Sequence, residues 1–144
     1  MTGKALSFYL QDKMFGLDIR LVKEISRKVD FSVVPDSDPN IVGLMNLRGQ
    51  VVTLFHLGKI LGLESDDLEQ EKESACIILK ALPNQPHQIG FLIDRTGDVI
   101  DIQEDWCEKT PANVEEINGE YIQEVVKLNE ELLLMLDTEV VFDA

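Results

Sequence analysis

The sequence has few cysteines and no long apolar run, and these absences exclude several classes of protein. Its two cysteines, Cys76 and Cys107, lie far apart and form no CxxC motif. This spacing excludes a disulfide scaffold and gives no signature of a zinc site. No apolar run approaches the ~18 residues that a membrane-spanning helix needs, so direct membrane insertion is not expected. The amino-terminal stretch lacks a secretion signal, and we expect a cytoplasmic protein.

Basic residues are also scarce, since 13 Lys and Arg residues stand against 27 Asp and Glu residues, a formal net charge of −14. Such a charge repels a phosphate backbone, so nucleic-acid binding is not expected. Residues 1–60 carry eight basic and six acidic side chains, a net of +2, whereas residues 61–144 carry five and 21, a net of −16. A local basic group comprises Arg20, Lys23, Arg27 and Lys28. The group is either an ordinary solvated face or one end of a polarised surface that meets partners of opposite sign.

The apolar residues fall in short runs that predict an all-β fold. Val, Ile, Leu and Phe dominate these runs, and most are about five to eight residues long. The predicted strands are Ala5–Leu10, Met14–Ile19, Val22–Ser26, Ile41–Asn46, Val51–Phe55, Ala75–Leu82, Gln88–Asp94, Val99–Ile102, Tyr121–Leu128 and Leu132–Asp137. Turn residues separate them at Gln11–Lys13, Asn46–Gly49, Pro83–Pro86, Arg95–Asp98 and Asn118–Gly119.

Helical signals are few and short. A helix is predicted over Phe55–Gly62, a final helix over Thr138–Phe142 after the capping residue Asp137, and a single turn over residues 19–22 after Asp18. None of them is long enough to cross over between two parallel strands, so a parallel α/β sheet is disfavoured.

The segment 64–73 holds six acidic residues and one basic residue. A stretch of this composition cannot bury itself and repels itself, which predicts an exposed loop. Roughly five predicted strands precede it and roughly five follow, which suggests two small antiparallel barrels. Each half, 1–63 and 74–144, is too small to be stable alone, so we expect the halves to share one apolar core within a single domain over residues 1–144.

No residue pattern indicates catalysis. His56 and His87 have no metal-ligand partner at a suitable spacing, and the chain lacks the common nucleophile, phosphate-binding and dinucleotide-binding motifs. We expect His56 to be a hydrogen-bonded structural residue and Asp94 to cap a turn. An enzyme would require His56 and a carboxylate to meet in a pocket. The sequence therefore predicts a non-enzymatic protein without a cofactor or a metal ion.

Two charged residues stand out from the predicted strands and turns around them. Glu24 lies between Val22 and Ile25 in a strand-like stretch. Arg48 lies in a tight turn after an apolar strand, where a guanidinium is well placed for a bidentate contact with a carboxylate. The alternative interpretation is an ordinary surface arginine.

Both residues lie within motifs that resemble the CheW family of chemotaxis coupling proteins. The resemblance covers nearly the whole chain, and its most specific part runs from Gly43 to Val52. The segments that carry it are Phe15–Ile19, Val22–Ile25, Val34–Pro35, Ile41–Val52, Ile89–Arg95, Asp98–Ile102 and Leu133–Asp137.

The resemblance implies two five-stranded SH3-like β-barrels that share one apolar core, with short helices. It also implies a non-enzymatic adaptor that couples the cytoplasmic tips of chemoreceptors to the histidine kinase CheA. The expected partners are the regulatory domain of CheA, which has the same fold, the helical hairpin of a methyl-accepting chemoreceptor, and other CheW-like domains in arrays. The adaptor would associate with the membrane through receptor complexes. The length leaves no room for a kinase or receiver domain, so we expect a free-standing adaptor.

The site residues carry over by position. Glu24 and Arg48 match two family residues associated with receptor and kinase coupling, through an ion pair near the docking surface. Gly43 and Gly49 match glycines that shape the backbone. The other expected docking residues are Val22, Ile25, Asn46 and Leu47.

Four residues depart from the usual family pattern. Pro, Asp, Arg and Val are common at the positions occupied here by Thr53, His56, Gly58 and Thr96. These departures leave the fold unaffected but bear on the choice of partner. The main alternative function is therefore a CheW-like scaffold of another two-component system, such as one for gliding or pilus motility.

Overall fold

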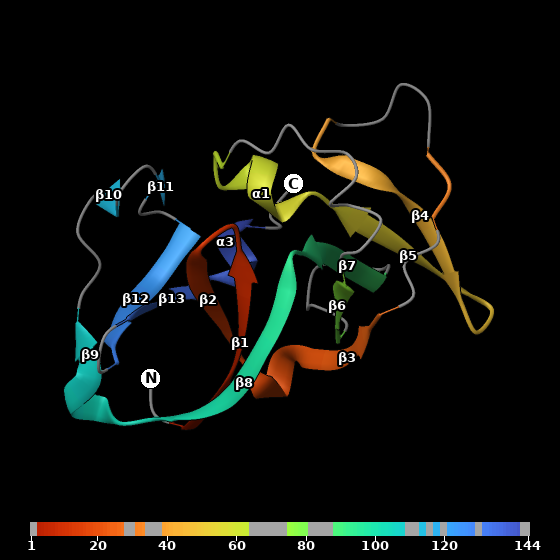
Figure 1. The fold of residues 1–144 in the computed structure, drawn as a ribbon. Coiled ribbons are helices and arrows are strands. Elements are labelled where there is room, and N and C mark those ends of the chain that lie inside the picture. Colours follow the sequence, from red (N-terminus) through yellow and green to blue (C-terminus); the bar gives the residue numbers. More distant parts are fainter. Residues whose placement is uncertain are drawn as a thin grey trace.

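Two β-sheets contain most of the regular structure of the chain (Figure 1). The computed structural model describes residues 3–27, 31–33, 39–63, 75–80, 88–108, 113–114, 117–118, 121–128 and 131–141. Its strands are β1 Gly3–Leu10, β2 Lys13–Asp18, β3 Val22–Ser26, β4 Ile41–Leu47, β5 Gln50–Phe55, β6 Ala75–Leu79, β7 Gln88–Ile93, β8 Arg95–Ile102, β9 Cys107–Glu108, β10 Asn113–Val114, β11 Ile117–Asn118, β12 Ile122–Lys127 and β13 Leu132–Leu136. The helical segments are η1 Ile19–Leu21, α1 Leu57–Ile60, η2 Glu104–Trp106 and α3 Thr138–Val141.

The first sheet has the strand order β8-β1-β2-β13-β12-β9, and the second has the order β3-β6-β7-β5-β4. Because β9 contributes only two residues, the first sheet also consists of five main strands. β10 and β11 form a separate two-stranded ribbon. The predicted all-β fold with two five-stranded units is therefore confirmed.

The two sheets do not follow the two halves of the sequence. β1 and β2 join β8, β12 and β13, and β3 to β5 join β6 and β7, so each sheet takes strands from both sides of segment 64–73. The prediction of purely antiparallel barrels is wrong at two places, because β13 runs parallel to β2 and β7 runs parallel to β5. A long stretch of chain separates the members of each pair, which permits parallel pairing without a crossover helix. The segment 64–73, Pro83–Pro86 and Gly119 lie outside the described residues.

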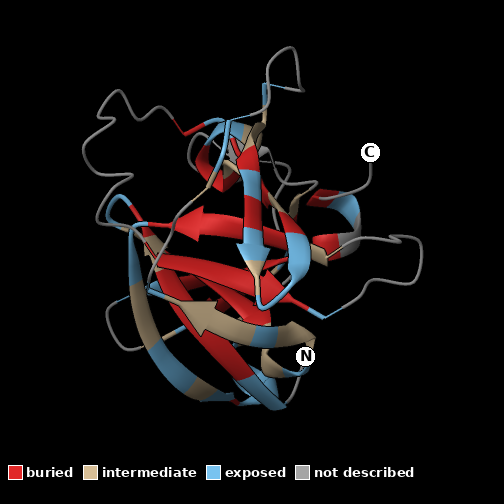
Figure 2. Cartoon of the chain, turned by 90° about the vertical axis from the view of Figure 1, so that its right-hand side faces the viewer, coloured by how far each residue is buried: buried red, intermediate tan, exposed pale blue. Residues whose placement is uncertain are grey.

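Alternate residues of the inner strands enter different hydrophobic clusters. On β1, Leu6, Phe8 and Leu10 lie in a central cluster between the sheets, whereas Ala5 and Tyr9 pack in a cluster of the first sheet. β6 divides its residues in the same way between the central cluster and a cluster of the second sheet. Successive strand residues point to opposite faces, so these strands are buried on both faces, as the red strands in Figure 2 show.

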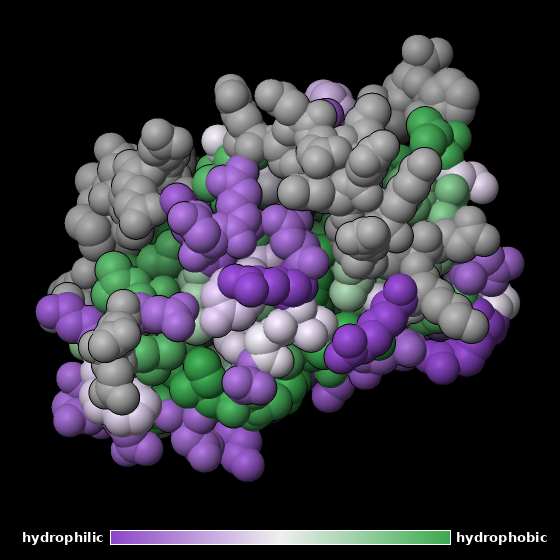
Figure 3. All heavy atoms as spheres, viewed as in Figure 1, coloured by the Kyte–Doolittle hydropathy of each residue, from purple (hydrophilic) through white to green (hydrophobic). Residues whose placement is uncertain are grey.

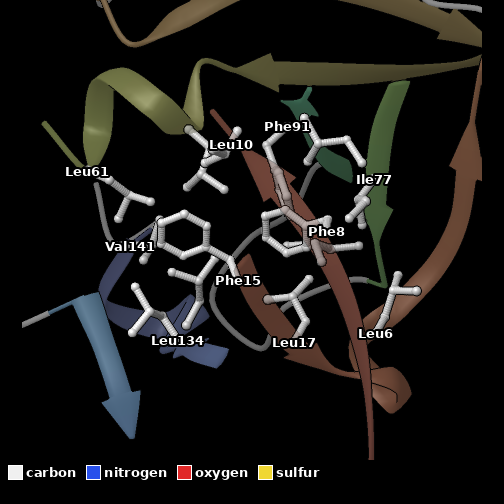
Figure 4. Close-up of a cluster of buried hydrophobic side chains, with 14 of the residues drawn as sticks. Leu6, Phe8, Leu10, Phe15, Leu17, Leu61, Ile77, Phe91, Leu134 and Val141 are labelled. Atoms are coloured by element: carbon white, nitrogen blue, oxygen red, sulfur yellow. The ribbon is translucent and has the colours of Figure 1, made fainter. Parts of the chain in front are cut away.

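The phenyl ring of Phe8 lies at the centre of the shared core (Figure 4). It stacks on Phe15 of β2 with ring centroids 6.0 Å apart, and it meets Phe91 of β7 at 5.4 Å. β2 belongs to the first sheet and β7 to the second, so Phe8 joins the two sheets directly. The central cluster contains residues of both sheets, which confirms the predicted common apolar core.

The predicted helical segments are present at the expected places. η1 begins after Asp18, whose carboxylate accepts a hydrogen bond from the Arg20 amide at 2.9 Å. The Arg20 side chain also hydrogen-bonds this carboxylate and lowers the pKa of Asp18 from its usual value. α1 is shorter than predicted, because Phe55 remains in β5 and Gly62 follows the helix at a φ of 83°. α3 follows Asp137 as expected.

The predicted turn at Arg95–Asp98 is wrong, because this stretch begins β8. Gly97 packs against Ser7 of β1, where an added Cβ would lie 2.3 Å from the Ser7 Oγ. The Ser7 hydroxyl donates to the carbonyl oxygen of Asp98 at 2.7 Å and accepts from its amide at 2.8 Å. These contacts lie at a register shift between β1 and β8, so the glycine serves a close strand contact and not a turn.

Removing the central ring should weaken both sheets together. We expect Phe8→Ala to lower the free energy of unfolding by about 3–5 kcal/mol, because the change leaves a cavity in a fully buried cluster. Urea denaturation measures this loss. Val99→Ala is the control, since Val99 is 52% exposed and its truncation should change stability by no more than about 0.5 kcal/mol. A loss below about 1 kcal/mol for Phe8→Ala would contradict the central role of the ring.

The two cysteines should differ in reactivity. Cys76 is fully buried, and burial raises the pKa of its thiol to about 11, whereas Cys107 is partly exposed. A thiol reagent at pH 8 is expected to modify Cys107 in the folded protein and Cys76 only after unfolding. Mass spectrometry of the labelled peptides distinguishes the two sites. Equal labelling rates in the native protein would show that Cys76 is not protected.

Candidate docking site

The β4–β5 hairpin ends in a two-residue turn that presents Arg48. Leu47 pairs with Gln50, and the two residues between them, Arg48 and Gly49, have φ values of 51° and 85°. Two successive positive φ values are typical of a type I′ hairpin turn, which glycine adopts easily and arginine does not. The Asn46 side chain stabilises the turn, because its Oδ1 accepts a hydrogen bond from the Gly49 amide at 3.0 Å. The chain therefore holds an arginine in an unfavourable backbone conformation at this exposed tip.

Arg48 forms an ion pair with Glu24 of β3, through its Nη2 and the Glu24 Oε1. The expected ion pair is therefore present, and Arg48 is not an isolated surface arginine. β3 and β4 are the two outer strands of the second sheet, so the pair links opposite edges of one sheet. Arg48 keeps 71% of its side chain exposed, and a partner protein can still reach its guanidinium.

The expected apolar docking residues are only partly accessible. Val22 and Ile25 of β3 are partly buried and pack against the central cluster. Leu47 is also partly buried and packs against the cluster of the second sheet. These side chains therefore support the fold as well as lying beside Glu24 and Arg48. The structure brings Glu24, Arg48, Asn46 and Leu47 together, while Val22 and Ile25 flank them on β3.

Two further apolar residues, Leu44 and Val51, are exposed on the hairpin that carries Arg48, and the sequence did not single them out. Leu44 of β4 is 38% exposed and Val51 of β5 is 57% exposed. Leu44 pairs with Thr53 and Val51 pairs with Asn46, so these four residues share the outer face of the hairpin. Val51 is exposed and the next residue, Val52, is buried. The sequence alone does not tell which of the two valines faces the core, so it could not identify Val51 as a surface residue.

Gly43 and Gly49 are needed for different structural reasons. An added Cβ at Gly43 would lie 2.3 Å from the carbonyl oxygen of Ser32, which pairs with Leu44 along the edge of β4. Gly49 supplies the second positive φ of the turn. Both positions therefore restrict the shape of the hairpin that carries Arg48.

Charge is distributed unevenly around the described part of the chain. The basic side chains Lys23, Arg27 and Arg48 are exposed on β3, just after it and on the adjoining hairpin. The edge of the first sheet along β8 and η2 carries one exposed basic side chain, Arg95, and the exposed acidic side chains Asp98, Asp101, Glu104 and Asp105. Val99 and Trp106 are exposed among these acids. Figure 3 shows apolar residues (green) reaching the surface between hydrophilic ones (purple).

The residues considered for catalysis have structural roles. His56 accepts a hydrogen bond at Nδ1 from the Lys59 amide at 3.2 Å and so caps α1, as expected of a structural histidine. Asp94 accepts from the Gln11 amide at 2.6 Å and caps the β1–β2 turn. Among the described residues, no group of His, Cys, Asp and Glu side chains could hold a metal ion. None of the described helices is long and apolar enough to span a membrane.

Residues 4–144 match the CheW-like domain. The chain belongs to the CheW-like family. It is 28% identical to the chemotaxis protein CheW of Treponema pallidum (strain Nichols) over 141 residues, 96% of this chain and 81% of that protein. It is also 28% identical to the chemotaxis protein CheW of Bacillus subtilis (strain 168) over 140 residues, 97% of this chain and 86% of that protein.

The structure agrees with this assignment. The crystal structure of the scaffolding protein TtCheW from Thermoanaerobacter tengcongensis superimposes with a TM-score of 0.85 at 26% sequence identity. The match covers 100% of this chain and 90% of that one. The protein is therefore a CheW-like chemotaxis scaffold and not an enzyme, as the sequence predicted.

Two substitutions separate the backbone effect of Arg48 from its ion pair. Arg48→Gly and Arg48→Ala both remove the pair, but only glycine relieves the positive φ. We expect the glycine variant to be the more stable by about 1 kcal/mol in the free energy of unfolding, measured with urea. At Arg95, whose φ is not positive, the same two substitutions should give the opposite order. An alanine variant at position 48 as stable as the glycine variant would argue against backbone strain at the turn.

Proposed function

We propose that this protein is an adaptor that couples the cytoplasmic tips of chemoreceptors to the histidine kinase CheA. The observation that carries the proposal is the Glu24–Arg48 ion pair at an exposed hairpin tip, in a chain of the CheW-like family. Both residues occupy the positions that the family associates with coupling. The protein makes no covalent chemistry in this role, so its activity is the sum of its contacts.

The surface around Arg48 suits a helical partner. Leu44 and Val51 provide exposed apolar area on the outer face of the hairpin, and Arg48 provides a directional polar contact at its tip. A receptor hairpin would place apolar side chains on Leu44 and Val51 and an acceptor group on Arg48. Contacts of this size are weak singly and gain strength when many copies bind together in an array.

The charge distribution suits partners at two places on the molecule. The basic residues near β3 favour an acidic partner, whereas the acidic edge along β8 and η2 favours a basic one. The regulatory domain of CheA and other CheW-like domains share this fold and would meet these surfaces through barrel ends and loops. The apolar residues Val99 and Trp106 lie within the acidic surface and would add burial to such a contact.

One observation favours the alternative of a scaffold for another two-component system, such as one for gliding or pilus motility. Thr53, which departs from the family pattern, lies on the outer face of the hairpin opposite Leu44. A threonine hydroxyl stands there in place of a proline ring, so the change alters the surface that a partner meets. The protein would then use the same hairpin with a different kinase and receptor.

Charge reversal at the hairpin tip tests the proposal. Co-sedimentation with CheA and a membrane-borne chemoreceptor of the same organism should show a ternary complex that changes kinase activity. Arg48→Glu places a carboxylate beside Glu24, so we expect the affinity to fall at least about tenfold. Lys59→Glu makes the same change of charge on α1, which belongs to neither of these surfaces, and serves as the matched control.

Each outcome of this experiment has a definite meaning. Binding by Arg48→Glu at the level of the unmodified protein would show that the docking site is wrongly assigned. Binding to CheA but to no receptor would indicate that the protein competes with a coupling protein or fills positions in the array. Binding to neither partner, but to the kinase of another motility system, would establish the alternative function.

A further inference from the structure

Two consecutive residues of β3 reach the β4–β5 hairpin, which a regular strand does not allow. Val22 pairs with Leu79 and Glu24 pairs with the adjacent Ile78, so Lys23 is an extra residue in β3. Successive side chains of a regular strand point to opposite faces, but a bulge re-aims them. Here Glu24 pairs with Arg48, and the Lys23 Nζ lies 3.5 Å from the Oε1 of Gln50, on the other side of the same turn.

Gln50 is in turn bonded to a second strand. It is the first residue of β5, and its Oε1 accepts a hydrogen bond of 2.6 Å from the Nε2 of Gln88. Gln88 is the first residue of β7, which runs parallel to β5 with Gln88 beside Val52. The two amides therefore meet where both strands begin, directly next to the turn that carries Arg48. Figure 1 shows this hairpin projecting at the right, with β3 below it.

The ion pair alone is a weak means of holding the hairpin. Arg48 is largely exposed, and exposed ion pairs contribute little and are screened by salt. A hydrogen bond between two neutral amides is not screened in this way. The hydrogen bond from Gln88 therefore holds the Gln50 side chain in place at high ionic strength, and the Lys23 contact with Gln50 links that side chain to β3.

We infer that Lys23, Gln50 and Gln88 are positioning residues for the docking tip. Together they form a second link beside the Glu24–Arg48 pair, and the bulge at Lys23 directs both links to one turn. The second link fixes the place of Arg48 and Val51 relative to β3 before a partner binds. Its role in coupling rests on the proposed function, whereas its effect on the hairpin does not.

Amide hydrogen exchange at Gly49, followed by NMR, measures the order of the turn without any partner. In the unmodified protein, we expect the rate at fixed pH to change less than about twofold between low salt and 1 M NaCl, because the amide link is not screened. In Gln50→Ala and Gln88→Ala, the Gly49 rate should rise about fivefold at 1 M NaCl, the effect of one ordinary hydrogen bond. At low salt the ion pair should limit this rise.

Two further variants make the test specific. Gln123→Ala, an exposed glutamine of β12 in the first sheet, should behave as the unmodified protein. Gln88→Glu should exchange as fast as Gln88→Ala at 1 M NaCl, because a carboxylate has no hydrogen to donate to the Gln50 Oε1. Slow exchange in Gln88→Glu would show that the packing of the side chain at position 88, and not its donated hydrogen bond, orders the turn.

The outcomes separate this inference from the proposed function. Unchanged exchange at Gly49 in Gln50→Ala and Gln88→Ala at 1 M NaCl would overturn the inference. If the exchange responds as expected and the same variants also lose CheA or receptor affinity at 1 M NaCl, the residues position a docking tip. If the exchange responds but Arg48→Glu binds both partners normally, the link is real and the proposed function of the tip is wrong.

Discussion

The burial of both faces of the inner strands is the constraint on which the rest of the structure depends. β1 can place Phe8 between Phe15 and Phe91 only because its opposite face is also covered, by the cluster that contains Ala5. Each sheet must therefore curve around an interior of its own while it shares the central cluster with its neighbour. Within the described residues, β3, β4, β8 and β9 are the outer strands of the sheets, and Ser32 pairs with part of the outer edge of β4.

The position of the candidate site follows from this contrast between buried inner strands and outer strands. Strands buried on both faces have no surface to offer, so contacts with partners must come from the edges and the turns that join them. The hairpin of β4 and β5 meets this requirement, because its inner face holds Met45, Val52 and Leu54 while its outer face is accessible. A glycine in contact with Ser32 and a turn with two positive φ values give the hairpin one defined shape.

Local patterns in the sequence predicted the strands well, because burial, β-propensity and turn chemistry act over a few residues. The parallel pairings of β2 with β13 and of β5 with β7 could not be predicted in the same way, since they join segments far apart in the chain. The turn predicted at Arg95–Asp98 was wrong because Gly97 has another reason to be glycine. Close contact with Ser7 requires a glycine just as a tight turn does. Glu24 and Arg48 were found through family motifs, whereas the contacts of Gln50 and Gln88 depend on side-chain geometry that no motif records.

β8 is a long strand at the edge of the first sheet. In the described part of the chain this eight-residue strand pairs with β1 only, so its other edge offers free backbone groups to any extended segment that approaches. Its exposed charged residues, Arg95, Asp98 and Asp101, disfavour indiscriminate pairing of one copy with the next. Such protection matters most at high local concentration, because every neighbouring copy carries the same strand edge. Charged side chains along the strand thus disfavour aggregation through its edge.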